Sequence, residues 1–199
     1  MEQFIKIFLP VYFSFYFLAT FLVPSLLVAK RAGQSALVLP NDNTVEGLTG
    51  RYFKLAIVLL SIYTFAYALF PGPISFFLSA WNASPKMQIA GIMILAAALG
   101  ISITALYYMK NSWRIGIDKN NKTDLITGGI FAYSRNPVFF SILLGLTGLM
   151  LLTPNTFTIS ISLAIYILIQ MQIRLEEAFL TEIHGQKYLN YKNETRRFI

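Results

Sequence analysis

The sequence predicts an all-α, polytopic integral membrane protein with about five transmembrane helices. The chain of 199 residues is 56% hydrophobic and only 13% charged, and its mean hydropathy is +0.59. Soluble domains contain about 25% charged residues. The apolar residues form runs that approach or exceed the roughly 20 helical residues that cross a bilayer. We expect one transmembrane domain, 1–199, with three spans in 1–109 and a loop, a helical hairpin and a tail in 110–199.

Five apolar runs define the predicted spans, roughly 4–29, 52–71, 88–109, 137–153 and 156–174. The first run is too long for the apolar core of a cleaved signal peptide, so we expect a retained helix. The segment 74–81 is apolar but short and is bounded by Pro and Gly, which favours an interfacial position over a sixth span. The turn 153–155 joins the last two runs into a hairpin. Both outer ends of this hairpin therefore lie at the same membrane face.

Three polar segments lie at that face. The loop 31–50 contains Gly, Pro, Asn and Asp and is expected to be irregular. The loop 110–136 is the longest polar stretch, and its part 119–122 is typical of a turn. The tail 175–199 has no helix breaker before Gly185, so we expect the last helix to continue into it.

The distribution of basic residues predicts the orientation of the chain. Only Lys6 and Lys86 lie at one face, while the other 14 of the 16 Lys and Arg residues lie at the opposite face. The positive-inside rule then gives an external N-terminus and a cytoplasmic C-terminus. The net charge of +7 also attracts anionic lipid headgroups. The basic residues are dispersed along membrane edges, which argues against nucleic-acid binding.

The composition excludes several kinds of chemistry. The chain has no cysteine, so disulfides, thiolate catalysis and cysteine metal sites are excluded. His184 is the sole histidine, so one chain has no multi-histidine metal centre. We therefore predict no metal site.

Arg135 stands at the beginning of the fourth run. Pro137 fits the first helical position, and Ser134 or Asn136 could cap the helix. Free amides and the helix dipole at this end favour an anion, and a guanidinium suits a carboxylate or a phosphate. The alternative is that Arg135 only binds a lipid phosphate under the positive-inside rule.

Two carboxylates, Glu176 and Glu177, follow the last run. The spacing places Gln170, Arg174 and Glu177 on one helical face and Glu176 beside it. Ionisable residues at membrane depth usually face a cavity or a partner. The alternative is a simple ion pair between Arg174 and Glu177 at the interface.

The loop before the fourth run adds glycines and aromatic residues. Gly128 and Gly129 allow the backbone to approach a ligand closely, or they only form a turn. Five aromatic residues could enclose a flat ring or a cation, or could form an interfacial belt. They are Trp113, Phe131, Tyr133, Tyr188 and Tyr191.

In this order the motifs resemble the isoprenylcysteine carboxyl methyltransferase and phospholipid methyltransferase superfamily of integral membrane enzymes. The resemblance covers roughly 110–197, and the segments that carry it are Ser112–Asp118, Gly129–Tyr133, Arg135–Ser141, Glu176–Leu180 and Gly185–Tyr191. The first of these is similar to the bacterial branch, which implies the inner or plasma membrane of a prokaryote. Three residues depart from the family pattern: Asn136 replaces histidine, Phe139 replaces tyrosine and Ser141 replaces glycine.

The resemblance implies S-adenosylmethionine as methyl donor, bound at the cytoplasmic mouth of the hairpin. Arg135 and the adjacent helix end would suit its carboxylate, and Glu176 or Glu177 its ammonium group or ribose hydroxyls. Glu177 is the candidate general base where the acceptor must lose a proton, and Arg135 is the second candidate catalytic residue. The full predicted cofactor-binding set is Gly129, Ile130, Phe131, Tyr133, Arg135, Asn136, Pro137, Glu176, Glu177 and Tyr188.

The expected acceptor is lipophilic and enters from the bilayer, as a lipid amine, a prenylated acid or a hydrophobic small molecule. The sequence does not choose among them, nor does it give an oligomeric state. Two alternatives remain open. One is an NADPH-dependent membrane reductase of the sterol reductase type. The other is a non-enzymatic binding, scaffold or transport protein that keeps the fold.

Overall fold

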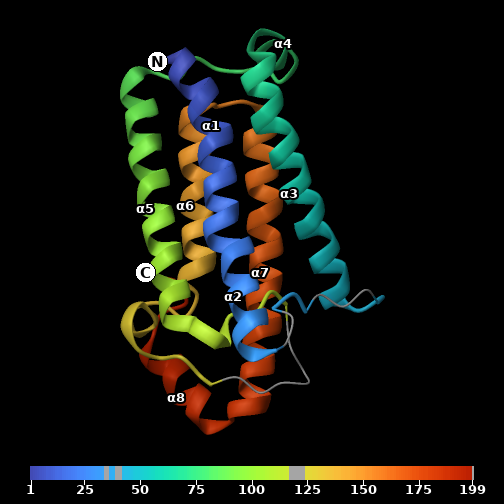
Figure 1. Ribbon diagram of the computed structural model, residues 1–199, viewed down its shortest axis with the longest axis vertical. Coiled ribbons are helices and arrows are strands. Elements are labelled where there is room, and N and C mark those ends of the chain that lie inside the picture. Colours follow the sequence, from blue (N-terminus) through green and yellow to red (C-terminus); the bar gives the residue numbers. More distant parts are fainter. Residues whose placement is uncertain (34–35, 39–41, 117–123, 199) are drawn as a thin grey trace.

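The protein is a bundle of antiparallel helices, seen in the computed structural model (Figure 1). The structure describes residues 1–33, 36–38, 42–116 and 124–198. Within these ranges the chain is helical and has no strand; an isolated bridge joins Leu37 to Ile115. The N-terminus lies at the same end of the bundle as α4, and α8 lies at the opposite end (Figure 1).

The first span is one helical path with a local widening. Helix α1 covers Glu2–Phe17, a π-helical segment covers Leu18–Leu22, and α2 covers Val23–Ala32. Pro24, in the first turn of α2, has no amide hydrogen to give the preceding turn. The amide of Val23 bonds to the carbonyl of Leu18, five residues earlier. The backbone thus remains helical past Pro24 and across the predicted first span.

Helix α3 covers Val45–Leu69 and begins before the predicted 52. Thr44 caps it, since its side-chain oxygen accepts the amide hydrogen of Gly47 at 3.2 Å. The expectation that the whole loop 31–50 is irregular is therefore wrong from Val45 onward, because a capped polar turn extends the helix. Positions 34–35 and 39–41 of this loop lie outside the described residues.

The segment 74–81 forms no sixth span. Its first part belongs to a short helix, α4, at Pro71–Phe77. Beyond α4 the backbone bonds to the turn between the last two helices: Trp81 donates to the carbonyl of Pro154 at 2.9 Å, and Thr156 donates to that of Leu78 at 3.0 Å.

Two of the predicted spans pack closely together. Helix α5 covers Pro85–Met109 and α6 covers Pro137–Leu152, both near their predicted bounds. Gly91 of α5 faces Gly148 of α6 so closely that a Cβ at either position would lie 2.9 Å from the other's carbonyl oxygen. The two glycines allow the helix backbones to touch.

Helix α7 covers Thr156–His184 and completes the predicted hairpin (Figure 1). Asn155 caps it through a reciprocal pair of hydrogen bonds with Thr158. The helix ends at Gly185, whose φ is +53°, so the expected continuation of the last helix is confirmed. Helix α8, at Gln186–Glu194, follows directly.

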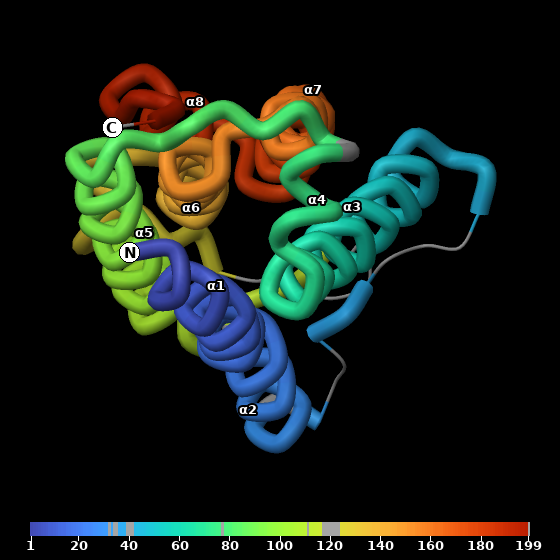
Figure 2. The backbone as a smooth tube through the Cα atoms, turned by 90° about the horizontal axis from the view of Figure 1, so that it is seen from above, coloured from blue at the N-terminus to red at the C-terminus, as the bar shows by residue number. Residues whose placement is uncertain are grey.

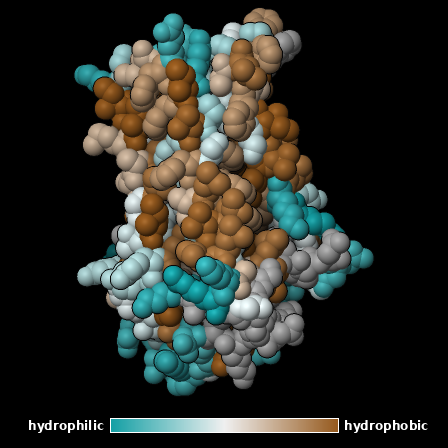
Figure 3. All heavy atoms as spheres, viewed as in Figure 1, coloured by the Kyte–Doolittle hydropathy of each residue, from teal (hydrophilic) through white to brown (hydrophobic). Residues whose placement is uncertain are grey.

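The exterior agrees with an integral membrane protein. Within the part of the chain that the structure describes, four helical segments are long and apolar enough to cross a membrane, and α6 is a shorter apolar helix. They are Glu2–Arg31, Val45–Leu69, Pro85–Met109 and Thr156–His184. Hydrophobic residues cover the middle of the bundle, and hydrophilic residues gather at the end that carries α8 (Figure 3). The chain is an all-α integral membrane protein.

Candidate functional site

The site lies where the beginning of α6, the last turns of α7, and α8 meet. A 3₁₀ turn at Gly129–Ala132 precedes α6. Gly129 has a φ of +62°, and a Cβ there would lie 2.2 Å from ring carbons of Tyr108. The close backbone approach expected at this glycine is therefore toward the end of α5.

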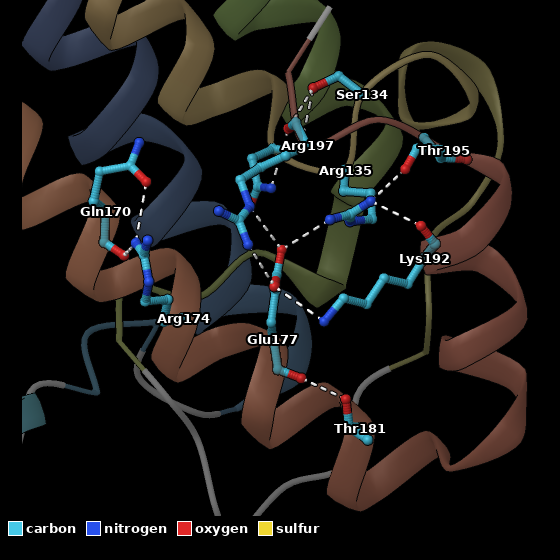
Figure 4. A network of polar contacts seen from close by, with 10 residues as sticks. Ser134, Arg135, Gln170, Arg174, Glu177, Thr181, Lys192, Thr195 and Arg197 are labelled. Carbon is cyan, nitrogen blue, oxygen red and sulfur yellow. Dashed lines mark hydrogen bonds and ion pairs between the residues drawn. The ribbon is translucent and has the colours of Figure 1, made fainter.

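Arg135 joins α6 to α7 and to the C-terminal tail (Figure 4). Its side chain is 10% exposed and donates to Oε1 of Glu177 at 3.0 Å. The same guanidinium donates to the backbone carbonyls of Lys192 and Thr195. The amide of Arg135 donates to the carbonyl of Arg196 at 2.9 Å. The helix beginning is thus fixed against the tail.

The carboxylate of Glu177 is surrounded by three cations (Figure 4). Arg197 donates to both oxygens, at 3.0 and 2.9 Å, and Nζ of Lys192 lies 3.3 Å from Oε2. Arg135 is the third cation. The hydrogen bonds to Glu177 raise the pKa of Arg197 above its ordinary value. This cluster of one anion and three cations has an excess of positive charge.

Arg174 takes no part in that cluster. Its guanidinium turns back along α7 and donates to the carbonyl and to Oε1 of Gln170, at 2.7 and 3.1 Å. The alternative prediction, an ion pair between Arg174 and Glu177, is therefore wrong. Glu177 instead pairs with Arg135, with α8 and with the tail, because the chain returns there after Gly185.

Capping of α6 also differs from the prediction. Asn136 is the N-cap residue, but its side chain makes no capping bond and donates to the carbonyl of Arg197 at 3.2 Å. Ser134 accepts the amide hydrogen of Asn136 at 3.2 Å and donates to the same carbonyl of Arg197. These side chains hold the tail at the helix end.

Glu176 has quite different surroundings from its neighbour. It is half-buried, and Nε2 of Gln172 donates to its Oε1 at 2.9 Å. Among the residues that the structure describes, no cation lies within ion-pair distance of it. Glu176 is therefore a carboxyl group without a cationic partner in this part of the structure, and the exposed Asp124 is another carboxyl group on the cavity wall.

A cavity of about 160 Å³ lies between these elements. Six predicted cofactor-binding residues line it: Phe131, Arg135, Asn136, Glu176, Glu177 and Tyr188. The other four do not line it. Pro137 is buried, Tyr133 is 73% exposed, and Gly129 and Ile130 form the turn behind Phe131.

Aromatic residues form one wall of the cavity. Tyr188 is 1% exposed, and the hydroxyl of Tyr191 donates to the carbonyl of Phe131 at 2.6 Å. Burial, with the charge of Glu177 nearby, raises the pKa of Tyr188, and burial raises that of Tyr191 to about 12. Both phenols are therefore neutral at physiological pH. Trp113, the remaining member of the predicted aromatic group, lines a different cavity.

Two of the three departures from the family pattern lie away from the charged cavity. Phe139 packs against the buried cluster that contains Ile165 and Ile169 of α7. Ser141 is fully buried, and its hydroxyl lies 2.5 Å from that of Ser102 on α5. Only Asn136 both departs from the pattern and lines the cavity.

The sequence did not single out several residues of this region. Gln172 was detectable, because it lies one helical turn before Glu176. Lys192 and Arg197 gave no local signal, since their role depends on the return of the chain after α8. Asp124, Leu125 and Phe179 also line the cavity. The predicted turn at 119–122 lies outside the described residues.

Comparison with known proteins agrees with this geometry. A search of the curated proteins gives no match. The family model described as phospholipid methyltransferase matches residues 87–187, from the first turn of α5 to the first turn of α8. This match covers half of the chain and both halves of the helical hairpin. Membership implies methyltransferase activity at a membrane, and the chain belongs to the phospholipid methyltransferase family.

Proposed function

We propose that the protein transfers a methyl group from S-adenosylmethionine to a lipophilic acceptor at the charged cavity. The observation that carries the proposal is the separation of charge along the cavity wall. Glu177 and its three cations give one region a positive excess, while Glu176 offers another region a carboxyl group that no cation of the described residues pairs with. S-adenosylmethionine likewise carries a carboxylate and cationic groups.

The positive region fits the carboxylate of such a ligand. Nε of Arg135 is buried and has no hydrogen-bond partner among the described residues. A buried donor without a partner costs about 1–3 kcal/mol. A carboxylate in the cavity would accept this hydrogen and reduce the positive excess around Glu177.

The remaining walls fit the rest of the ligand. Glu176 would hold the ammonium group, which S-adenosylmethionine and its demethylated product both carry, and the apolar walls near Phe131, Phe179 and Leu180 would take an adenine ring. This assignment revises the predicted division of the site. Glu177 keeps Arg135 and Arg197 in place, and Glu176 supplies the cation-binding side, with Asp124 as a second carboxyl group on the cavity wall.

The bound donor would supply a methyl group activated on a sulfonium. The protein's share is to orient the two reactants and to exclude water, which together contribute much of the acceleration in such displacements. Glu177 is poorly suited to accept a proton while three cations surround it, so we propose that it acts as a positioning residue. This proposed role takes the place of the general base expected at Glu177.

Lipids are the substrates that the family suggests, and the apolar exterior agrees with an acceptor that arrives through the bilayer. We also propose that the cavity lies at the cytoplasmic face, where S-adenosylmethionine is present. This follows from the predicted N-out, C-in orientation, because α8, whose Tyr188 and Tyr191 line the cavity, lies at the end of the bundle opposite the N-terminus (Figure 1).

Binding measurements on protein in lipid nanodiscs test the proposal. Isothermal titration with S-adenosylmethionine, its demethylated product and NADPH compares the candidate ligands. We expect the first two to bind and Glu176→Gln to weaken both about tenfold to a hundredfold, because a hydrogen bond to a charged group is worth about 1.5–3 kcal/mol. Glu182→Gln, an exposed site on the same helix, is the matched control.

Binding of NADPH alone would contradict the proposal and favour the reductase. Equal binding by Glu176→Gln and the wild type would contradict the placement of the cation-binding side. Transfer of a methyl label from S-adenosylmethionine into a lipid extract, followed by identification of the product, then names the acceptor.

A further inference from the structure

A second cavity, of about 230 Å³, lies inside the helix bundle. Its walls come from the first span, α3, α5, α6 and α7, and include Phe17, Phe53, Leu60, Ile142 and Gly145. Among the described residues, no lysine, arginine, aspartate or glutamate lines it. A cavity with such walls accepts hydrocarbon and excludes charged groups.

This apolar cavity adjoins the charged cavity. Trp113 lines the apolar cavity, while its neighbours in sequence, Ser112 and Arg114, line the charged one. At the beginning of α6, Asn136 lines the charged cavity and Val138 the apolar one. The backbone on either side of Trp113 and at the beginning of α6 therefore runs between the two cavities.

The polar side chains of the apolar cavity are bonded within the protein, with one exception. The Tyr and Thr hydroxyls among its walls find partners on α1, α3 or α5, and they belong to Tyr12, Tyr16, Thr20 and Thr64. The indole N–H of Trp113 is buried and has no partner among the described residues. A buried donor of this kind needs an acceptor, and indole only donates.

We propose that the apolar cavity holds a hydrocarbon chain of the methyl acceptor, and that the indole N–H of Trp113 binds an oxygen of its head group. The identity of this ligand as the acceptor rests on the proposed function. A chain seated among Phe17, Ile142 and Gly145 places its head group beside Trp113, at the wall of the charged cavity. Trp113 then selects acceptors whose head group carries a carboxylate or phosphate oxygen.

Tryptophan fluorescence tests occupancy of the cavity without any methyl donor. The chain has two tryptophans, so Trp81→Phe leaves Trp113 as the sole indole. Octadecanoic acid brominated along its chain should quench this fluorescence in nanodiscs. Gly145→Leu fills the cavity and should abolish the saturable quenching. Gly100→Leu is the matched control, because Gly100 also has open space beside it but does not line the cavity.

Isothermal titration tests the N–H donor. Hexadecanoate and hexadecylphosphocholine are the carboxylate and phosphate probes, and hexadecylamine has no oxygen. Trp113→Phe keeps an aromatic ring and loses the donor. Whichever oxygen-bearing probe binds the wild type should therefore bind this variant about tenfold to a hundredfold more weakly. Hexadecylamine should bind the wild type and Trp113→Phe equally well. The control variant Trp81→Phe should change the binding of neither the oxygen-bearing probes nor hexadecylamine.

Preference for one oxygen-bearing probe supports the proposal and identifies the source of the oxygen. Quenching that persists in Gly145→Leu would overturn the hydrocarbon site, as would failure of both oxygen-bearing probes to bind. Unchanged binding by Trp113→Phe would overturn the role of the N–H. If the probes behave as expected and S-adenosylmethionine does not bind, the proposed function fails and the lipid site stands.

Discussion

Glu176 and Glu177 are adjacent on α7 but have opposite surroundings. This difference favours a structural role for Glu177 and a ligand-binding role for Glu176. The Glu177 side chain is 8% exposed and is bonded to two arginines and a lysine, whereas Glu176 has only Gln172. The local sequence places the two on different parts of the helix surface but does not show which of them pairs with cations. The distinction arises because Glu177 faces α8 and the returning tail.

Replacement of Glu177 by Gln should destabilise the protein. The change leaves the buried guanidinium of Arg135 without its counter-charge, and removal of one partner from a buried ion pair costs about 3–5 kcal/mol. Arg197 and Lys192 are 33% and 40% exposed and contribute less. We expect a loss of about 3 kcal/mol, measured by denaturant unfolding in detergent.

Glu182→Gln is the control for this variant, since Glu182 is exposed on the same helix. It should change the free energy of unfolding by less than about 0.5 kcal/mol. Equal stability of the two variants would show that the Glu177 cluster contributes nothing to the fold.

Contact between α5 and α6 depends on two glycines. A Cβ at Gly148 would lie 2.8 Å from Cγ of Leu95 and 2.9 Å from the carbonyl oxygen of Gly91. The backbone oxygen is not free to turn aside, so Gly148→Ala should separate the helices. Overpacking of this kind costs about 1–3 kcal/mol, and the same denaturant unfolding measures it.

Gly145→Ala, one turn earlier on α6, is the matched control for packing, because nothing lies within 4 Å of its Cβ position. This change should be neutral or stabilising by up to about 1 kcal/mol, since alanine favours a helix more than glycine. Effects of the same sign and size at both positions would refute the close contact.

The helices of this protein were largely predictable from its sequence. The apolar runs predicted the four helical segments that are long enough to span and the shorter apolar α6, and the turn at 153–155 predicted the hairpin that Asn155 caps. The early start of α3 was missed because its first turns are polar, and hydropathy does not detect a helix of that kind. The π-helical segment before Pro24 was missed because hydropathy is the same for either helix type.

The candidate site was predictable only in part. Arg135, Glu176 and Glu177 follow from their places at the two ends of the hairpin, and the structure brings them to one cavity. The bonds among them depend on the tail, in which Arg197 reaches Glu177 and Phe198 packs near Phe140. Contacts between residues so far apart have no periodic signature in the sequence.

At the scale of the molecule, both halves of the chain share buried clusters. Ile5 and Leu9 of α1 pack with Tyr63 of α3, with Leu95 of α5 and with Leu149 of α6. We therefore propose that 1–199 fold as one transmembrane domain. Its two ends differ: α4 and the α6–α7 turn lie at the end that faces the viewer in Figure 2, and α8 lies at the opposite end (Figure 1). Tyr188 and Tyr191 of α8 line the charged cavity.

The orientation of this domain can be measured on the whole protein, because the chain contains no cysteine. Asn82→Cys places an exposed thiol beyond α4, and Asn190→Cys places one on α8. Since 14 of the 16 basic residues lie at the α8 end of the predicted topology, that end should face the cytoplasm. A membrane-impermeant maleimide should then label the Asn82→Cys variant in intact cells, and the Asn190→Cys variant only in inverted vesicles or after permeabilisation. The reverse pattern would place the charged cavity outside the cell, away from a cytoplasmic methyl donor, and would contradict the proposed function together with the orientation.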